Sequence, residues 1–163
     1  MIKEANEVAK VIGLNGGTLI GRTRLQKTFY FLEALNCGFG FDFAYHIYGP
    51  YCDELADTTS FAKASGLIDE KVKTADTGPY SIYSSHCTAE LLDPLDQKRA
   101  DILARLRKVD AITLELAATA DYLSKSGFAA DAWDETTKRK ASKATTDKVA
   151  KAQSLLVELS QFR

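Results

Sequence analysis

Histidine and cysteine, two common metal-binding residue types, are scarce in this chain. It has two histidines, His46 and His86, and three cysteines, Cys37, Cys52 and Cys87. An odd number of scattered cysteines does not make a disulfide framework. A zinc site needs three or four ligands, and His86 and Cys87, as neighbours on an expected strand, point to opposite faces. We therefore expect no metal site and no cofactor.

Long apolar runs and catalytic motifs are also missing. No segment approaches the roughly 20 apolar residues that a membrane-spanning helix requires, and no leader with a basic n-region and an apolar h-region is evident. We expect a cytoplasmic location and no membrane partner. No G-x-S-x-G elbow occurs, and Cys87 has no base beyond a neighbour that faces away. We therefore expect a protein that is not an enzyme and has no catalytic residues.

The composition is that of an ordinary globular protein. With 163 residues, of which 45% are apolar and 26% charged, the chain can form one self-sufficient core, or one domain with a helical extension. Its formal net charge is −1. That balance argues against a strongly basic nucleic-acid-binding protein, although it leaves room for a local basic patch.

The segment from Arg22 to Ile68 organises the predicted structure. Thr23 and Gln26 have the spacing of a capping box. Behind them, apolar residues recur at helical spacing up to Leu35. This pattern predicts a long, well-buried helix.

Strand and turn signals follow this helix. Residues 41–47 alternate as a half-buried strand does. Gly49-Pro50 then starts a second helix, because proline is tolerated at the first helical position. Residues 67–75 and 80–87 read as a hairpin around a glycine–proline turn. Helix, strand, helix and hairpin in this order predict a winged-helix-like unit.

After Cys87 the pattern is almost purely helical. Asp93-Pro94 is a helix-start signal, Asp110 begins a further helix, and Thr145 or Thr146 caps the last one. We therefore predict a mainly α fold with a small β component. A winged-helix-like unit with an N-terminal helix occupies residues 1–87, and a helical extension, residues 88–163, packs on it to give one compact domain.

Several motifs resemble a known family. They are Leu25-Gln26-Lys27 with Tyr30-Phe31-Leu32, then Tyr48-Gly49-Pro50-Tyr51, and then Leu114 to Thr119 with Tyr122-Leu123. These motifs are similar to those of the YwgA-like family, a group of small bacterial proteins related in style to the Panacea (SocA-like) antitoxin domains. The related module of the antitoxin DarG binds and occludes a nucleic-acid-modifying toxin. The resemblance therefore implies an antitoxin-like, protein-binding module.

Three cations lie at the start of the first predicted helix: Arg22, Arg24 and Lys27. Cations at a helix N-terminus oppose the helix dipole, so we expect them to bind an anionic partner. The alternative is that they are solvated, or paired with acids such as Asp53 and Glu54.

The predicted helix from Pro50 to Ser65 bears on whether the chain binds DNA. Residues 50–70 contain five acids and one lysine, a net charge of −4, which the phosphates of duplex DNA would repel. We therefore predict a protein partner, a toxin-like enzyme whose active cleft is covered by this acidic helix and the turn before it. The predicted partner-binding residues are Arg22, Arg24, Lys27, Tyr48, Pro50, Tyr51, Asp53, Glu54 and Asp57.

The alternative function is a winged-helix, DNA-binding transcriptional regulator. It would use the cations at 22, 24 and 27 together with a basic cluster, which otherwise forms a solvated face. That cluster consists of Lys138, Arg139, Lys140, Lys143, Lys148 and Lys151. Glu115 lies in an otherwise apolar or small-residue helix, and is either a functional carboxylate or a partner of a lysine.

Overall fold

The computed structural model describes the whole chain, residues 1–163. It contains seven α-helices, five short strands and a final 3-10 turn. In chain order these are α1 (Ile2–Leu14), β1 (Thr18–Ile20), α2 (Arg22–Ala34), β2 (Ala44–His46), β3 (Gly49–Tyr51), α3 (Asp53–Ala64), β4 (Ile68–Ala75), β5 (Gly78–Ser85), α4 (Asp96–Leu106), α5 (Ala111–Lys125), α6 (Ala132–Arg139), α7 (Thr146–Leu159) and η1 (Ser160–Phe162). The strands form two antiparallel sheets, one of order β1-β5-β4 and one made of β2 and β3.

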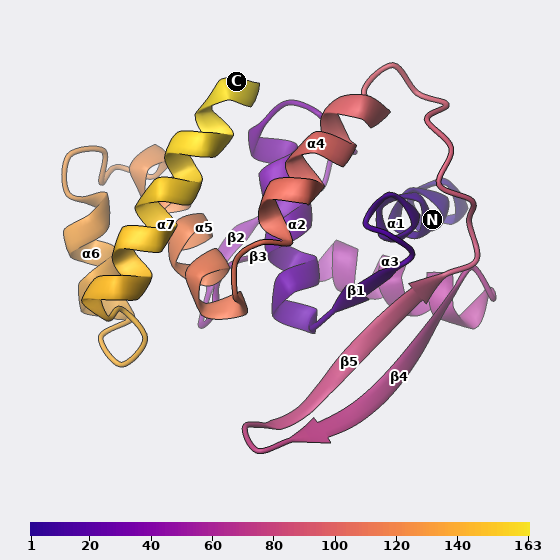
Figure 1. Ribbon diagram of the computed structural model, residues 1–163, viewed down its shortest axis with the longest axis horizontal. Coiled ribbons are helices and arrows are strands. Elements are labelled where there is room, and N and C mark those ends of the chain that lie inside the picture. Colours follow the sequence, from indigo (N-terminus) through magenta and orange to yellow (C-terminus); the bar gives the residue numbers. More distant parts are fainter.

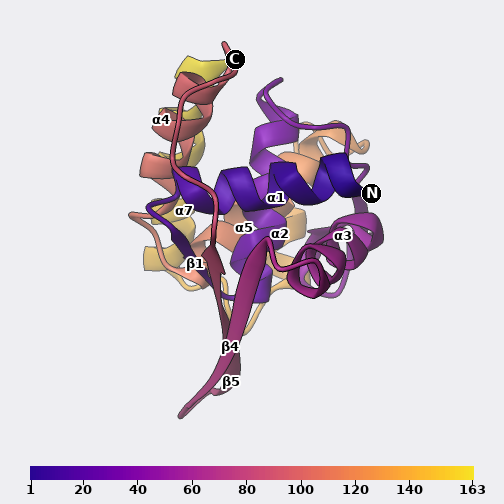
Figure 2. The same ribbon diagram turned by 90° about the vertical axis from the view of Figure 1, so that its right-hand side faces the viewer.

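Helices α2 and α5 lie in the middle of the body (Figure 1). α2 packs against α5 and β3, while α5 also contacts α6 and α7. α1 packs against α3 and β5. The β4–β5 hairpin projects away from the helices, as Figure 2 shows from the side. One core of 29 buried residues is drawn from both halves of the chain, so the two halves share their interior.

The predicted fold class is wrong. The structure is a mixed α/β fold in which 55% of the residues are helical and 15% lie in strands of small sheets. A winged-helix-like unit in residues 1–87, with a helical half packed on it, is not confirmed. The reason lies in the surroundings of α2. Its residues Phe29 and Leu32 are fully buried, and α2 packs against α5 as well as against elements of its own half.

The predicted capping box at the start of α2 is absent. Gly21 precedes the helix, and no side chain caps its first turn. Gln26 is instead buried, and it forms two hydrogen bonds with the backbone of Cys52. Its Nε2 donates to the carbonyl oxygen (3.0 Å), and its Oε1 accepts the N–H (2.9 Å). The carboxamide therefore joins α2 to the start of α3.

The helix that was predicted to start at Pro50 begins three residues later. Pro50 lies in β3, where it pairs with Tyr45 of β2. Proline is tolerated there because both strands of a two-stranded sheet are edge strands. Cys52 is the N-cap of α3, and its Sγ accepts the N–H of Leu55 (3.4 Å).

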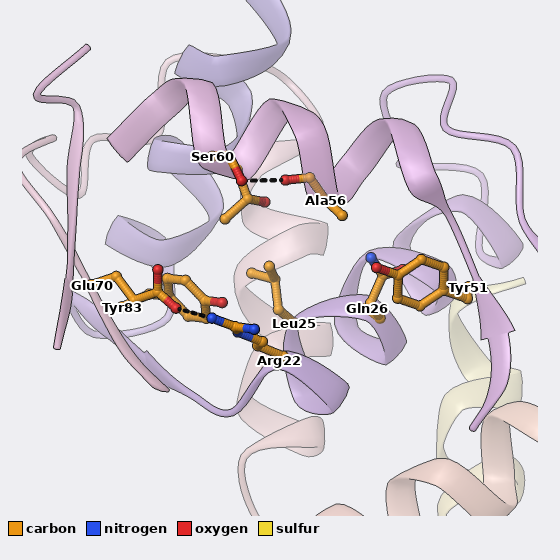
Figure 3. A pocket seen from close by; sticks show the side chains of 9 residues that line it. Arg22, Leu25, Gln26, Tyr51, Ala56, Ser60, Glu70 and Tyr83 are labelled. Atoms are coloured by element: carbon orange, nitrogen blue, oxygen red, sulfur yellow. Dashed lines mark hydrogen bonds and ion pairs between the residues drawn. The ribbon is translucent and has the colours of Figure 1, made fainter. Parts of the chain in front are cut away.

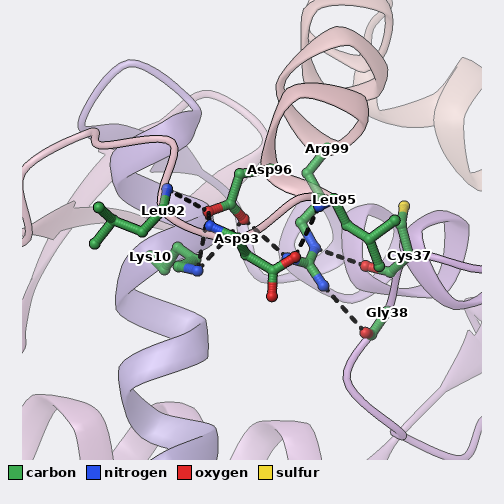
Figure 4. A network of polar contacts seen from close by, with 8 residues as sticks. All are labelled: Lys10, Cys37, Gly38, Leu92, Asp93, Leu95, Asp96 and Arg99. Atoms are coloured by element: carbon green, nitrogen blue, oxygen red, sulfur yellow. Dashed lines mark hydrogen bonds and ion pairs between the residues drawn. The ribbon is translucent and has the colours of Figure 1, made fainter.

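A buried carboxylate fixes the loop before α4 (Figure 4). Asp96 is fully buried and accepts hydrogen bonds from Lys10 of α1 (3.0 Å) and Arg99 of α4 (2.8 Å). It also accepts the backbone N–H groups of Leu92 (3.1 Å) and Asp93 (2.8 Å). The loop therefore ends at Asp96, which is the first residue of α4, and not at the predicted Asp93-Pro94 start.

These contacts also set the acidity of Asp96. Burial alone would raise its pKa, but the hydrogen bonds from the backbone, Arg99 and Lys10 outweigh burial and lower the pKa below its ordinary value. A carboxylate with a lowered pKa in the folded state stabilises the fold above its unfolded pKa, about 3.9. This stabilisation is lost as the pH falls through the folded-state value.

We predict that Asp96→Asn lowers the free energy of unfolding by about 3 kcal/mol at pH 7, because it leaves the buried Arg99 with only the longer ion pair to Asp93 (3.5 Å). The difference in free energy of unfolding between wild type and variant should shrink as the pH falls below about 4. At such pH values the wild type also loses the stabilisation from the ionised carboxylate. Urea unfolding across pH measures both effects. Asp101→Asn, on the exposed side of α4, should change stability by less than about 0.5 kcal/mol. An Asp96 variant as stable as this control would contradict the role assigned to Asp96.

Candidate functional site

The acids predicted to bind a partner lie on the outer surface of α3. Asp53, Glu54 and Asp57 are all exposed, and none forms an ion pair within the chain. Lys63, the one cation of α3, pairs with Glu70 of β4 (3.1 Å). Asp53 and Glu54 lie in the first turn, where carboxylates complement the helix dipole. Asp57 has no such local role. We call these three residues the acidic face of α3.

Arg22 and Arg24 both have partners within the chain. Arg22 pairs with Glu70 (Nη2–Oε1 3.1 Å) and stays largely exposed. Arg24 donates to the backbone carbonyls of Leu106 (2.9 Å) and Val109 (2.6 Å), at the C-terminal end of α4. A cation at that end complements the dipole of α4, which offsets its unfavourable position at the start of α2. The alternative pairing with acids of α3 is not formed.

Lys27 is buried and holds the turn between β2 and β3. Its side chain is 1% exposed, and its Nζ donates to the carbonyl of Pro50 (2.7 Å). Lys140, just after α6, donates to the carbonyl of Ile47 in the same turn. Two ammonium groups from different elements therefore bind the backbone of this turn from inside the protein.

Glu115 neutralises part of this buried charge. Its side chain, on α5, is 3% exposed and accepts hydrogen bonds from Lys140 (3.1 Å) and Lys143 (2.9 Å). Of the two predicted readings of Glu115, the structure shows the lysine-paired one. We call Lys27, Glu115, Lys140 and Lys143 the buried lysine cluster. It contains three basic groups and one carboxylate.

The predicted residues of the turn differ in how much surface they present. Pro50 is buried. Tyr51 is half-buried and packs against His46, with ring centres 5.1 Å apart. Tyr48 is 55% exposed and lies over Nζ of Lys143 (4.8 Å to the ring centre). Among the predicted site residues of this turn, Tyr48 therefore presents the most surface to a partner.

A pocket of about 180 Å³ opens between α3, the start of α2 and the base of the β4–β5 hairpin. It is lined by Arg22, Leu25, Gln26, Tyr51, Ala56, Thr59, Ser60, Glu70 and Tyr83. In Figure 3, Arg22 and Glu70 meet on one side, Gln26 and Tyr51 lie on the opposite side, and α3 passes above. The pocket thus brings together Arg22 and Tyr51, two predicted site residues that are distant in sequence.

Glu70 was not among the predicted site residues, yet it connects three elements around this pocket. Besides Arg22 and Lys63, it accepts a hydrogen bond from the hydroxyl of Ser81 (2.6 Å). Burial alone would raise the pKa of Glu70, but these three contacts outweigh burial and bring the pKa down to about 2. Strand alternation could have identified it, since Glu70 shares a face of β4 with the buried Ile68.

The predicted basic cluster at 138–151 is largely paired. Arg139 pairs with Glu135 (2.7 Å) and Lys148 with Asp110 (2.9 Å). Lys151 pairs with Asp147, and Lys140 and Lys143 share Glu115. Lys138 alone has no carboxylate within 4 Å. Most of these cations therefore already have an acidic neighbour.

The structure shows neither a metal-binding cluster nor a membrane-spanning helix. No group of three or more His, Cys, Asp or Glu side chains is placed to hold a metal ion. His86 pairs with Asp69 on the surface (2.8 Å). None of the helices combines the length and the apolar character needed to cross a bilayer.

We predict that Gly49→Ala destabilises the fold more than Gly78→Ala. Both glycines have positive φ, +84° and +112°, which costs alanine roughly 1–2 kcal/mol. A Cβ at Gly78 meets open space, whereas one at Gly49 overlaps the hydroxyl oxygen of Thr119 on α5. The overlap should add about 1–3 kcal/mol. Thermal unfolding measures both effects. Equal losses of stability in the two variants would show that the turn does not pack against α5.

We predict that Lys27 gives the stability a specific pH dependence. Burial lowers its pKa to about 8, with Glu115 opposing the shift and Lys140 and Lys143 adding to it. An unfolded lysine has a pKa of about 10.4, so between these values the unfolded chain binds more protons and stability rises with pH.

Lys27→Met should remove this rise. Wild type should gain about 2 kcal/mol relative to the variant between pH 8 and pH 10.4 in urea unfolding. Lys73→Met, at an exposed position of β4, is the control and should leave the wild-type slope unchanged. A Lys27 variant with the same slope as wild type would mean that this lysine is not buried as a cation.

No family model matches the chain. Over 126 residues it is 29% identical to the uncharacterized protein YwgA of Bacillus subtilis (strain 168), and the match covers 75% of each chain. The name of this protein states no activity. The comparison therefore indicates relatedness and gives no function. The likeness supports a YwgA-like family for this chain.

Proposed function

We propose that the chain is a non-enzymatic, antitoxin-like module that binds a toxin-like or other nucleic-acid-acting protein and occludes it. The binding surface is the acidic face of α3 together with Tyr48 and Tyr51 of the preceding turn. The observation that carries this proposal is that Asp53, Glu54 and Asp57 are exposed and free of internal ion pairs. They are available to cations of another molecule.

The distribution of charge supports a protein over DNA as the proposed partner. An enzyme that acts on nucleic acid presents a basic cleft to the phosphates of its substrate. The acidic face of α3 matches such a cleft and repels phosphates. Arg24 and Lys27 are bound to backbone carbonyls, and most of the cluster at 138–151 is paired. Most of the cations that a DNA-binding regulator was predicted to use are therefore already engaged within the chain.

The kinship points in the same direction. The YwgA-like family is related in style to the Panacea (SocA-like) domains and to the toxin-binding domain of DarG. For this chain, the relation to antitoxins is part of the proposal. It makes the product of the neighbouring reading frame the first partner to test.

We predict that neutralising the acidic face weakens the complex with that product. Purified proteins are compared by calorimetric titration. The triple variant Asp53→Asn, Glu54→Gln, Asp57→Asn should raise the dissociation constant roughly 3- to 30-fold, as expected for several exposed charge pairs. The control Asp42→Asn, Glu90→Gln, Asp134→Asn removes the same charge from exposed sites elsewhere and should leave affinity unchanged.

Two results would overturn the proposal. One is that the neighbouring product forms no complex with the chain, or forms one that the two triple variants weaken equally. The other is a mobility shift of random duplex DNA at physiological salt with a steep salt dependence, which would indicate a DNA-binding regulator.

A further inference from the structure

The pocket beside α3 has space for one large side chain. Its volume is about 180 Å³, and a cavity of about 150 Å³ already accommodates benzene. Leu25, Ala56 and the ring of Tyr83 give it apolar surface, and Tyr51 lies on one side (Figure 3). Such a pocket suits a side chain with a long apolar stem.

The hydroxyl groups of α3 in this pocket can only accept further hydrogen bonds. The hydroxyl of Thr59 donates to the carbonyl of Leu55 (2.7 Å), and that of Ser60 donates to the carbonyl of Ala56 (3.1 Å). A hydroxyl has one proton and two lone pairs. Both protons are committed to the helix backbone, so the oxygens present lone pairs to anything that enters.

Glu70 provides a further acceptor. Its carboxylate has roughly four lone-pair positions, of which Arg22, Lys63 and Ser81 occupy three. The charges of Arg22 and Glu70 cancel within the lining. Asp53 and Asp57 of the acidic face add two negative charges at the rim, since they are one helical turn from Ala56 and Ser60. Lys63 offsets one of them. The pocket and its rim therefore favour a cationic donor.

We propose that this pocket binds an arginine side chain of the protein partner. The guanidinium donates to the hydroxyl oxygens of Thr59 and Ser60 and to the free position on Glu70. Its aliphatic stem packs on Leu25 and Ala56. Arginine fits better than lysine because it has five donors in a planar fork, enough to reach several separate acceptors at once. This inference rests on the proposed function, since it names the residue by which the partner is anchored.

The test uses a small probe and needs no protein partner. N-acetyl-L-arginine amide is titrated into the ¹⁵N-labelled chain and followed by two-dimensional NMR. Saturable shifts should appear at Leu25, Ala56 and Ser60, with a dissociation constant on the order of 1 mM, which is normal for a ligand of this size. The neutral isostere N-acetyl-L-citrulline amide should bind at least tenfold more weakly.

Matched variants locate the site. Ala56→Leu fills the pocket while keeping a good helix former, and it should weaken arginine amide binding at least tenfold. Ala64→Leu, at an exposed position outside the pocket on the same helix, should leave binding unchanged. If Ala56→Leu alters the amide spectrum globally, Ser60→Ala is used instead and should weaken binding at least threefold.

The outcomes separate this inference from the proposed function. Equal binding of citrulline amide, unsaturable shifts, or undiminished binding by Ala56→Leu (or by Ser60→Ala where it is used instead) would overturn the arginine pocket. This holds even if a partner protein docks on α3. Binding of arginine amide that shows the expected variant effects supports the pocket even if the neighbouring product forms no complex.

Discussion

Glu115 is buried on α5 between two lysine ammonium groups, with a third lysine close by, and the seating of the β2–β3 turn depends on that charge balance. Without the carboxylate, the buried ammonium groups of Lys27 and Lys140 would have no compensating charge, and the partly exposed Lys143 would add to their repulsion. With it, Lys27 and Lys140 can donate to the carbonyls of Pro50 and Ile47. The turn is thereby attached to α2, α5 and the end of α6. Cys52 and the start of α3 follow directly, and Gln26 attaches them to α2 in the same region.

Many cations of the chain and the carboxylates of α3 lie in different surroundings. Long cationic side chains reach inward or across to backbone carbonyls, as Arg24 does at the end of α4 and Lys98 does at Leu35 (2.6 Å). The short carboxylates of α3 cannot reach comparable partners and stay in solvent. A chain with a net charge near zero thus acquires a locally acidic surface. That surface lies beside a pocket whose own ion pair, Arg22 with Glu70, is already satisfied.

Features set by short-range hydrogen bonds could be predicted from the sequence, and features set by long-range ones could not. Asp110 and Thr145 begin helices as expected, because each accepts an N–H only three residues away. Gln26 has a capping-box spacing, but its carboxamide bonds Cys52, 26 residues further on. Periodicity identified the helices, yet it could not show that α2 packs on α5.

The same distinction applies to the candidate site, where only some features could be predicted from the sequence. Asp53, Glu54 and Asp57 were identified from the net negative charge of their predicted helix, and they are exposed. The partners of Arg22 and Lys27 could not be identified from the sequence, because they lie on a strand and on a turn that contact α2 only in the folded chain. Glu70 and the pocket around it are likewise a product of packing between β4, α2 and α3.

The projecting hairpin has a consequence for how copies of the chain avoid one another. β4 is an edge strand of the three-stranded sheet, so one side of its backbone has no neighbouring strand. Free N–H and C=O groups of this kind can recruit a strand from another molecule and lead to aggregation. Lys71 and Lys73 are exposed along β4, and charged side chains, lysine especially, are a common means of blunting such an edge. These lysines thus disfavour pairing of the β4 edge with a strand of another copy, at the most protruding part of the molecule.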